Sequence, residues 1–472
     1  GANTYSGTTT VNGGTLTLSG GSALANSMAV TVNAAGLLKL ASSEEIATLA
    51  GAGLVNLQGN ALTLSGASDT TFSGVISGAA GSLVKNGSSV FTLSGANSFG
   101  GGVALSAGAI QAGNDAALGT GSLTFSGGRL SSDSNTARTL ANALVLSGSL
   151  GLGDATNTGA LTLSGNAALT GNTTLTVASA AVLGGIVSGA YNLVKEGASE
   201  LTLSGANTYS GTTTVNGGTL TLSGGSALAN SMAVTVNAAG LLKLASSEEI
   251  ATLAGAGLVN LQGNALTLSG AADTTFSGVI SGAAGSLVKN GSSVFTLSGA
   301  NSFGGGVALS AGAIQAGNDA ALGTGSLTFS GGRLSSDSNT ARTLANALVL
   351  SGSLGLGDAT NTGALTLSGN AALTGNTTLT VASAAVLGGI VSGAYNLVKE
   401  GASELTLSGA NTYSGTTTVN GGTLTLSGGS ALANSMAVTV NAAGLLKLAS
   451  SEEIATLAGA GLVNLQGNAL TL

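Results

Sequence analysis

Four amino acids are missing from this chain. Its 472 residues include no cysteine, histidine, proline or tryptophan, and charged residues make up only 6% of them. Without cysteine the chain has no disulfide and no thiolate, and without histidine as well it cannot build most nucleophilic or zinc sites. The absence of proline suits paired strands, because proline would remove a hydrogen bond from the ladder. We therefore expect a protein that is not an enzyme, with no cofactor.

Acidic residues outnumber basic residues by 18 to 11, and the net charge is −7. No basic patch is visible, so nucleic acid is not an expected partner. The glycine-rich turns lack the Gly-Lys-Ser/Thr ending of a phosphate loop, and we expect no small-molecule substrate. Neither a signal peptide nor an apolar run of membrane-spanning length is visible in the sequence.

Glycine and apolar residues are plentiful instead. The chain has 80 glycines, and 43% of its residues are hydrophobic. Leucine and valine recur at short, regular spacing, whereas a disordered chain lacks apolar side chains or carries a high net charge. Collagen is excluded because it requires glycine at every third position together with proline.

The sequence repeats itself almost letter for letter. Residues 1–204 recur at 205–408 with one difference, Ser68 against Ala272, and a third copy fills 409–472 without a change. We interpret these ranges as repeat unit 1, repeat unit 2 and a partial unit 3 of one continuous solenoid. Both ends fall inside a motif, so we expect a segment of a longer array. A protein with one active site does not need nearly identical copies of its sequence. A protein that needs length, a large surface or many equal contacts does.

Short runs in which a large apolar residue alternates with threonine or another small residue predict the strands. Alternation with a period of two places leucine and valine inward and threonine outward. Ser-Gly, Gly-Gly and Asn-Gly dipeptides separate the runs and mark corners, where glycine adopts positive φ. In the first unit the runs are 15–18, 29–32, 37–40, 54–57, 61–64, 90–93, 123–125, 144–146, 161–163, 175–177 and 201–203.

These strands predict an all-β fold, a right-handed parallel β-helix (β-solenoid) in the form of a rod. A sandwich would not propagate identically, whereas stacked coils pair each strand with the coils above and below. At roughly 20 residues per coil a unit holds about ten coils, and at ~4.8 Å per coil it rises ~50 Å, or ~110 Å for the chain. Residues 42–50 could form a short capped helix, but we favour a coil side or loop there.

Each unit contains two diverged halves that align with one another. The run 83–85 (Leu-Val-Lys) aligns with 193–195, and Asn97 aligns with Asn207. Phe99 aligns with Tyr209. Old divergence of the halves followed by recent duplication of the whole unit is the simplest account.

Residues 193–220 read LVKEGASELTLSGANTYSGTTTVNGGTL. This run resembles the passenger-associated transport repeat of bacterial autotransporters, and residues 116–125 resemble the segment that often follows it. The resemblance covers 74–110, 184–220, 278–314 and 388–424. It implies a secreted, surface-displayed passenger with a right-handed β-helix, in a family whose repeat is associated with efficient passage across the outer membrane. The family's membrane barrel is not in this segment, so we expect the outer-membrane translocator outside it.

Carboxylates are the remaining candidates for chemistry. Glu44 and Glu45 are adjacent, and Glu196 and Glu200 lie near Lys195. Paired carboxylates can cleave glycosides, but no aromatic platform accompanies them, and a solvated charged turn is the better interpretation. Each Asp stands alone, which disfavours calcium. We therefore predict no catalytic, cofactor-binding or metal-binding residues.

Three minor patterns have simple explanations. Asn86 and Asn172 fit the glycosylation pattern, although an Asn-Gly turn explains the first. Threonines could align on one face as in ice-binding solenoids, but their spacing varies too much. We expect core stacking for most aromatic residues of the first unit, which are Tyr5, Phe72, Phe91, Phe99, Phe125 and Tyr191.

Together these features favour an extracellular structural protein, at a bacterial cell surface or in a secreted filament. As a hypothesis it is an adhesin-like stalk or fibre for adhesion, cell–cell association or matrix formation, with surface ligands or other copies of itself, end to end or side by side, as partners. Each added period would repeat a weak surface contact and raise avidity. The alternatives are a β-helical polysaccharide-acting enzyme and an amyloid-like self-assembling fibre.

Overall fold

A computed structural model describes residues 2–230, 232–434 and 436–472. They belong to two compact units, residues 1–232 with 239–242 and residues 233–238 with 243–472. Each unit is a parallel β-solenoid, and the chain makes about 23 turns in all. The predicted all-β solenoid, with about ten coils in each full period, is therefore confirmed. The described residues contain no helix, and thus none of a length and apolarity that would span a membrane.

The first period contains strands β1 to β22, most of them three or four residues long. Their bounds are β1 Thr9–Leu18, β2 Ala29–Leu40, β3 Glu44–Ile46, β4 Thr48–Gly51, β5 Leu54–Asn56, β6 Ala61–Leu64, β7 Thr70–Phe72, β8 Val75–Ser77, β9 Ser82–Lys85, β10 Val90–Leu93, β11 Val103–Leu105, β12 Ala109–Ala112, β13 Leu123–Phe125, β14 Arg129–Ser132, β15 Arg138–Leu140, β16 Leu144–Leu152, β17 Leu161–Leu163, β18 Ala167–Val177, β19 Ala181–Leu183, β20 Val187–Ser188, β21 Leu193–Glu196 and β22 Glu200–Leu203.

The second period repeats this pattern. Strands β23 to β44 have the bounds of β1 to β22 moved by one full period, from β23 at Thr213–Leu222 to β44 at Glu404–Leu407. The remaining strands are β45 Thr417–Val419, β46 Gly422–Leu426, β47 Ala437–Val440, β48 Gly444–Leu448, β49 Glu452–Glu453, β50 Thr456–Ala458, β51 Leu462–Asn464 and β52 Leu470–Thr471. The two full periods thus have the same strands, whereas in the third, partial copy the counterparts of β1 and β2 are each divided into two strands.

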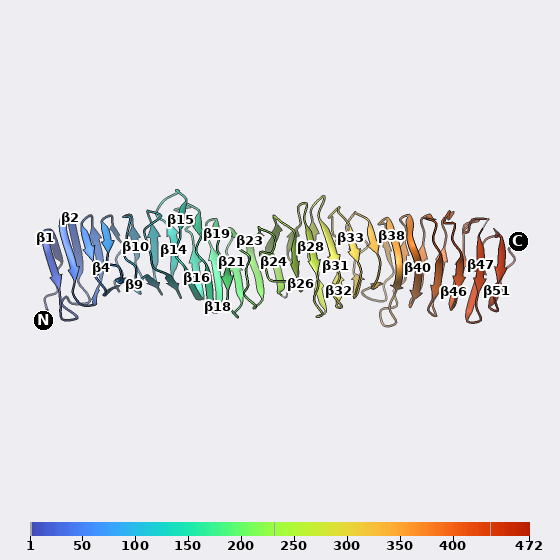
Figure 1. The fold of residues 1–472 in the computed structure, drawn as a ribbon, viewed down its shortest axis with the longest axis horizontal. Coiled ribbons are helices and arrows are strands. Elements are labelled where there is room, and N and C mark those ends of the chain that lie inside the picture. Colours follow the sequence, from blue (N-terminus) through green and yellow to red (C-terminus); the bar gives the residue numbers. More distant parts are fainter. Residues whose placement is uncertain (1, 231, 435) are drawn as a thin grey trace. The chain divides into compact units, whose positions relative to one another are not determined.

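The strands of the first unit lie on three sides, and their described pairings are parallel. Figure 1 shows the strands following one another turn by turn. The first sheet runs through β3, β6, β9, β11 and β13, and then through the first parts of β16 and β18 to β20. The second runs through β4, β7, β10, β12 and β14, and then through the second parts of β16 and β18 to β21. The third side contains β5 and β8, and later β15, β17, β19 and β22.

All eleven runs predicted in the first unit overlap strands, and the runs 29–32 and 37–40 belong to one strand, β2. Residues 42–50 do not form the possible helix, because β3 and β4 occupy this segment; the favoured coil side is therefore confirmed, and the loop is not found. The physical reason lies in the pairing. Glu44 and Ile46 alternate inward, and β3 pairs with the leucine-rich β6. This ladder prevails over the weak helix propensity of the segment.

The core follows the predicted alternation. Rows of inward side chains stack from turn to turn, such as Leu62, Leu83 and Val103 on the first sheet. Most aromatic residues of the first unit are core residues, as expected. The buried ones are Phe72, Phe91, Phe99 and Phe125, and the exposed ones are Tyr5 and Tyr191.

Glycine is required where successive turns approach one another. A Cβ on Gly74 would lie 1.8 Å from the carbonyl oxygen of Gly53, and one on Gly95 would lie 1.8 Å from the carbonyl oxygen of Gly74. Only a residue without a side chain fits such a column. The close approach explains part of the high glycine content.

Candidate functional site

Two lysines in each period point into the core. Lys85 lies in an inward row between Leu64 and Leu105 and is fully buried. Its ammonium donates to the carbonyl oxygen of Gly87. Burial lowers the pKa of Lys85, and the nearby Asp69 carboxylate partly opposes this effect.

The second lysine has a fuller set of partners. Lys195 lies between Leu175 and Val215 in an inward row of the second sheet, again with no exposed surface. Its Nζ donates to the carbonyl oxygens of Glu196 at 2.7 Å, Gly197 at 2.9 Å and Gly217 at 3.0 Å. Burial lowers the pKa of Lys195 to about 8, against a smaller opposite effect of the Glu196 carboxylate. The ammonium therefore joins its own turn to the next one.

A buried asparagine joins three successive turns in each half of the period. Asn97 accepts a hydrogen bond from the backbone N–H of Ile76 at 2.7 Å and donates to the carbonyl oxygen of Ala117 at 2.6 Å. Asn207 bonds in the same way to Val187 and to Ala227, at 2.7 and 2.6 Å. Both side chains are 4% exposed, so these bonds satisfy backbone groups that water does not reach.

A third buried group distinguishes the two halves. The Tyr209 hydroxyl lies 2.6 Å from the hydroxyl oxygen of Thr213, which donates to the Met232 sulfur at 2.8 Å. In the first half the aligned residues are Phe99 and Val103, both buried and without a hydroxyl. At these two aligned core positions, the second half therefore has two hydroxyl-bearing side chains and the first half has two apolar ones.

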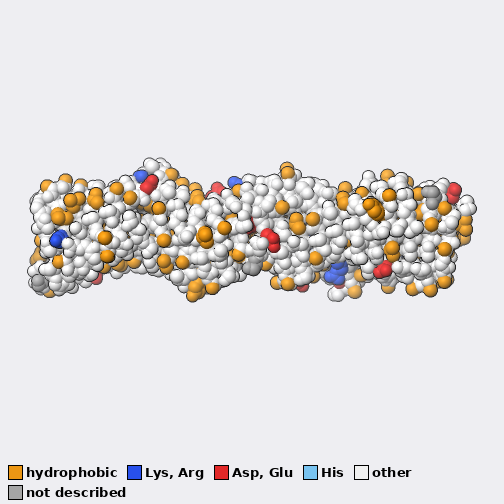
Figure 2. All heavy atoms as spheres, in the orientation of Figure 1, with side chains coloured by type: hydrophobic (Ala, Val, Ile, Leu, Met, Phe, Trp, Pro, Cys, Tyr) orange, Lys and Arg blue, Asp and Glu red, His pale blue; other side chains and the backbone are white. Residues whose placement is uncertain are grey.

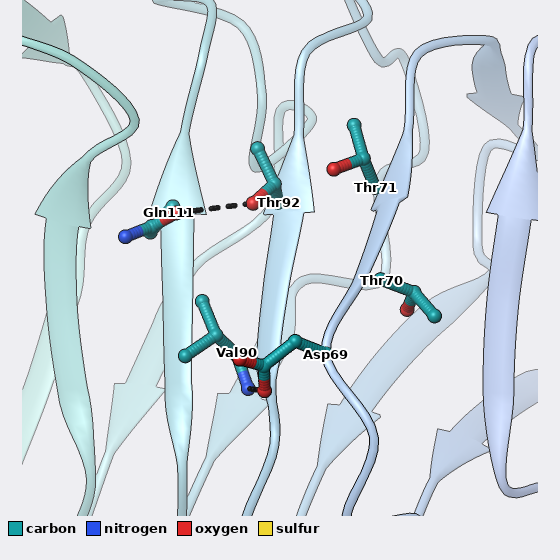
Figure 3. A pocket seen from close by; sticks show the side chains of 6 residues that line it. All are labelled: Asp69, Thr70, Thr71, Val90, Thr92 and Gln111. Carbon is teal, nitrogen blue, oxygen red and sulfur yellow. Dashed lines mark hydrogen bonds between the residues drawn. The ribbon is translucent and has the colours of Figure 1, made fainter.

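The outer surface carries few charges. Figure 2 shows only a few charged side chains on the visible face, scattered among uncharged atoms. On the second sheet of the first unit the outer side chains form a shallow polar groove of about 290 Å³ (Figure 3). Its lining consists of Asp69, Thr70, Thr71, Val90, Thr92 and Gln111.

Strand register places the polar groups of this groove. Thr71, Thr92 and Gln111 are direct neighbours on β7, β10 and β12, one per turn. The Thr92 hydroxyl donates to Gln111 Oε1 at 3.1 Å, and Asp69 Oδ1 accepts from the Val90 N–H at 2.7 Å. Figure 3 shows the Asp69 carboxylate at one end and the row of Thr71, Thr92 and Gln111 at the other.

The second unit contains the same groove with a volume of about 280 Å³. Asp273 Oδ1 accepts from the Val294 N–H at 2.7 Å, and the Thr296 hydroxyl donates to Gln315 at 3.1 Å. The only difference between the two full periods, Ser68 against Ala272, immediately precedes the aspartate of each groove. The groove thus recurs with the repeat rather than occurring once.

Comparison with known families finds a repeat that contains the buried lysines and asparagines. The model of the passenger-associated transport repeat matches residues 1–21, 83–112, 193–225, 287–316 and 397–429. The chain contains five passenger-associated transport repeats. Together with the β-solenoid, these transport repeats match an autotransporter passenger, which confirms the resemblance seen in the sequence. The family implies a secreted or surface-exposed protein with a structural role. No curated protein and no solved structure matches the chain significantly.

Each buried lysine lies inside a transport repeat. The last four matches contain Lys85, Lys195, Lys289 and Lys399, and each of these side chains is at most 1% exposed. The same four matches contain the buried asparagines Asn97, Asn207, Asn301 and Asn411. The Lys-x-Gly and Gly-x-Asn parts of the repeat are therefore explained by contacts inside the solenoid.

The acidic candidates of the sequence do not come together. Glu44 is 3% exposed and accepts hydrogen bonds from the backbone N–H groups of Ala23 at 2.9 Å and Leu24 at 2.7 Å. The solvated turn expected for Glu44 is therefore wrong, because its place on β3 turns it inward, where it closes the preceding loop. Glu196 and Glu200 bond to Asn216 and Thr221 of the next turn. These carboxylates connect turns of the solenoid.

The other charged groups pair locally. Arg129 forms an ion pair with Asp154, and Arg138 lies 3.2 Å from Asp133. Hydrogen bonds from backbone N–H groups and the charge of Arg129 hold the pKa of Asp154 below its usual value, although burial acts in the opposite direction. Within the residues that the structure describes, no cluster of three or more His, Cys, Asp or Glu side chains could hold a metal ion.

Sequence reasoning missed the inward lysines, although a signal was present. In the run 83–85 (Leu-Val-Lys) a period of two places Lys85 on the face of Leu83. The grooves were also missed. They depend on which turns are neighbours, and single-sequence patterns do not give this register.

Proposed function

We propose that this chain acts as a repetitive stalk or fibre at the bacterial surface, where it supports adhesion or cell–cell association. The observation that supports the proposal is the recurrence of the same strands and the same outer groove in both full periods. A surface that presents a weak contact repeatedly gains avidity without a strong single site. Its partners are surface ligands or other copies of the chain.

The rigid connections inside each unit fit this mechanical role. Buried lysines, asparagines and glutamates join successive turns, and glycine columns let these turns approach closely. Such a scaffold holds its outer side chains at fixed spacing. In this proposal the chain acts by presenting side chains at fixed positions and does not catalyse a reaction.

A bead assay tests this function with the full chain. Beads coated with the protein should aggregate with one another or bind bacterial cells, whereas albumin-coated beads should do neither. A longer chain with one additional copy of residues 205–408, coupled at the same molar density, should strengthen the signal several-fold because contacts multiply. Beads that stay dispersed and do not bind cells at any chain length would refute the proposal.

A further inference from the structure

The polar groove on the second sheet has hydrogen-bonding groups left over. Asp69 uses Oδ1 for the Val90 N–H, and Gln111 uses Oε1 for the Thr92 hydroxyl. Within the described residues no hydrogen bond engages Asp69 Oδ2, the Gln111 amide nitrogen or the Thr71 hydroxyl. The groove therefore presents one charged acceptor, one amide donor and one hydroxyl that can do both.

These groups are arranged along the stack of turns. Thr71, Thr92 and Gln111 come from three successive turns at the same register position. Neighbouring parallel strands are ~4.8 Å apart, so the row is ~10 Å long. An extended ligand that lies along the solenoid would meet one polar group per turn.

The chemistry of the groove narrows the class of ligand. The Asp69 carboxylate repels anions, and the chain has a net charge of −7. The lining contains no aromatic side chain and only Val90 as a large apolar one, so a flat apolar ligand finds no platform. A single carboxylate is too little for a multivalent cation or a strongly basic peptide. Hydroxyl groups, which both donate and accept, complement this set best.

We propose that the groove binds a neutral, hydroxyl-rich glycan chain, with the sugar hydroxyls bonded to Asp69, Thr71, Thr92 and Gln111. The copy in the second unit, with Asp273, Thr275, Thr296 and Gln315, binds the same class of ligand. Affinity at one groove is weak, about millimolar, because the site is shallow and has no stacking platform. The inference rests on the proposed surface function, for which it names the ligand class, and the recurrence of the groove supplies the avidity.

The test measures binding to the isolated full chain without cells or beads. Saturation-transfer NMR is recorded with cellotetraose and maltotetraose as neutral probes, tetragalacturonate as an anionic probe and tetralysine as a cationic probe. At least one neutral tetrasaccharide should give signals, and the charged probes should not. Substitution of both grooves together (Thr92→Val, Gln111→Leu, Thr296→Val and Gln315→Leu) should weaken these signals about five- to tenfold, because two neutral hydrogen bonds are lost.

A matched control shows whether the loss of binding depends on the groove or follows from replacing any outward threonine. Thr162→Val with Thr366→Val alters the third side, on β17 and its copy β39 at Leu365–Leu367, and should leave the signals unchanged. Circular dichroism confirms that every variant keeps its strands. The proposal is overturned if no neutral sugar gives signals, if the groove variant binds as the wild type does, or if tetralysine or tetragalacturonate is the probe that depends on the groove. Because this readout is independent of bead aggregation, failure here leaves the surface function standing.

Discussion

The two halves of a period carry the same transport repeat on different sides of the solenoid. Lys85 lies on the first sheet, whereas Lys195, its counterpart in the second half, lies on the second sheet. Five turns lead along the first sheet from β9 through β11, β13, β16 and β18 to β20, and β21 follows on the next side. The repeat in the second half therefore begins five turns further along the solenoid than the repeat in the first half. It is also moved from the first of the three sides to the second.

This rotation shows which contacts the repeat needs. The buried lysine and asparagine make the same kinds of bonds on either side, to carbonyl and N–H groups of their own and adjacent turns. The repeat thus depends on its neighbouring turns and not on a particular sheet. The outer residues are free to differ between the halves.

The outer residues do differ. At the positions of Val90 and Gln111 in the groove, the second half has Glu200 and Thr221, and these two bond to each other. The groove is thus a property of the first half, while the inner bonds are common to both. The outer faces of these strands thus differ between the halves, whereas their inner faces keep the same kinds of contacts.

Replacement of the buried asparagines should lower the local opening free energy more than any other change, and by similar amounts in the two halves. Asn97→Ala, or Asn207→Ala, leaves one N–H and one carbonyl group buried without a partner, which should lower the local opening free energy by about 2–5 kcal/mol. Hydrogen exchange of the adjacent strands measures it. Because the two periods yield identical peptides, each change is made in both copies, at Asn301 or Asn411.

Exposed Asn86 provides the control for this experiment. Asn86→Ala together with Asn290→Ala should change the opening free energy by less than about 0.5 kcal/mol. If only one half responds to loss of its asparagine, the two repeats are not equivalent inside the solenoid, and the comparison between the halves fails.

The lysines predict a pH dependence with a definite sign. Burial lowers the pKa of Lys195 and of Lys399 to about 8, from an ordinary 10.5. Between these values the unfolded chain holds more protons than the folded chain, so the unfolding free energy should rise with pH, by up to about 3 kcal/mol per lysine. Urea unfolding at pH 7.5, 9 and 10.5 measures this rise.

Replacement by methionine isolates the contribution of the lysines. Lys195→Met with Lys399→Met should remove the part of the rise that these groups cause, and Lys85→Met with Lys289→Met should act in the same direction, since burial lowers those pKa values too. An unfolding free energy that falls between pH 8 and 10.5, and falls equally in the methionine variants, would contradict this assignment.

The hydroxyl pair of the second half should have a smaller effect. Thr213→Val with Thr417→Val leaves the buried Tyr209 and Tyr413 hydroxyls without their threonine partner, at a cost of about 1–3 kcal/mol per site. Hydrogen exchange around β23 and β45 reports the loss. The control is Thr9→Val, because its partner Tyr5 is 47% exposed and water can replace the lost bond. Equal losses at both kinds of site would show that burial of the tyrosine is irrelevant.

The sequence allowed prediction of the solenoid because alternation and glycine corners are local signals. The strand at 61–64 and the buried Phe72 follow from such patterns. The fate of Glu44 could not be predicted, because its partners Ala23 and Leu24 belong to the preceding turn. The groove needed the same missing information, since Thr71, Thr92 and Gln111 are neighbours only after the register is known.

Removing both hydroxyls should have the smallest effect and provides the most direct test of the comparison. Tyr209→Phe with Thr213→Val, made also at Tyr413 and Thr417, converts the second half to the phenylalanine and valine of the first half. No buried hydroxyl is then left without a partner, so the opening free energy should change by less than about 1 kcal/mol. The valine change alone should cost more than the double change, and the double-variant effect minus the sum of the two single-variant effects is the coupling energy of the pair. If the double variant instead loses the sum of both single effects, the two halves have cores that cannot be exchanged.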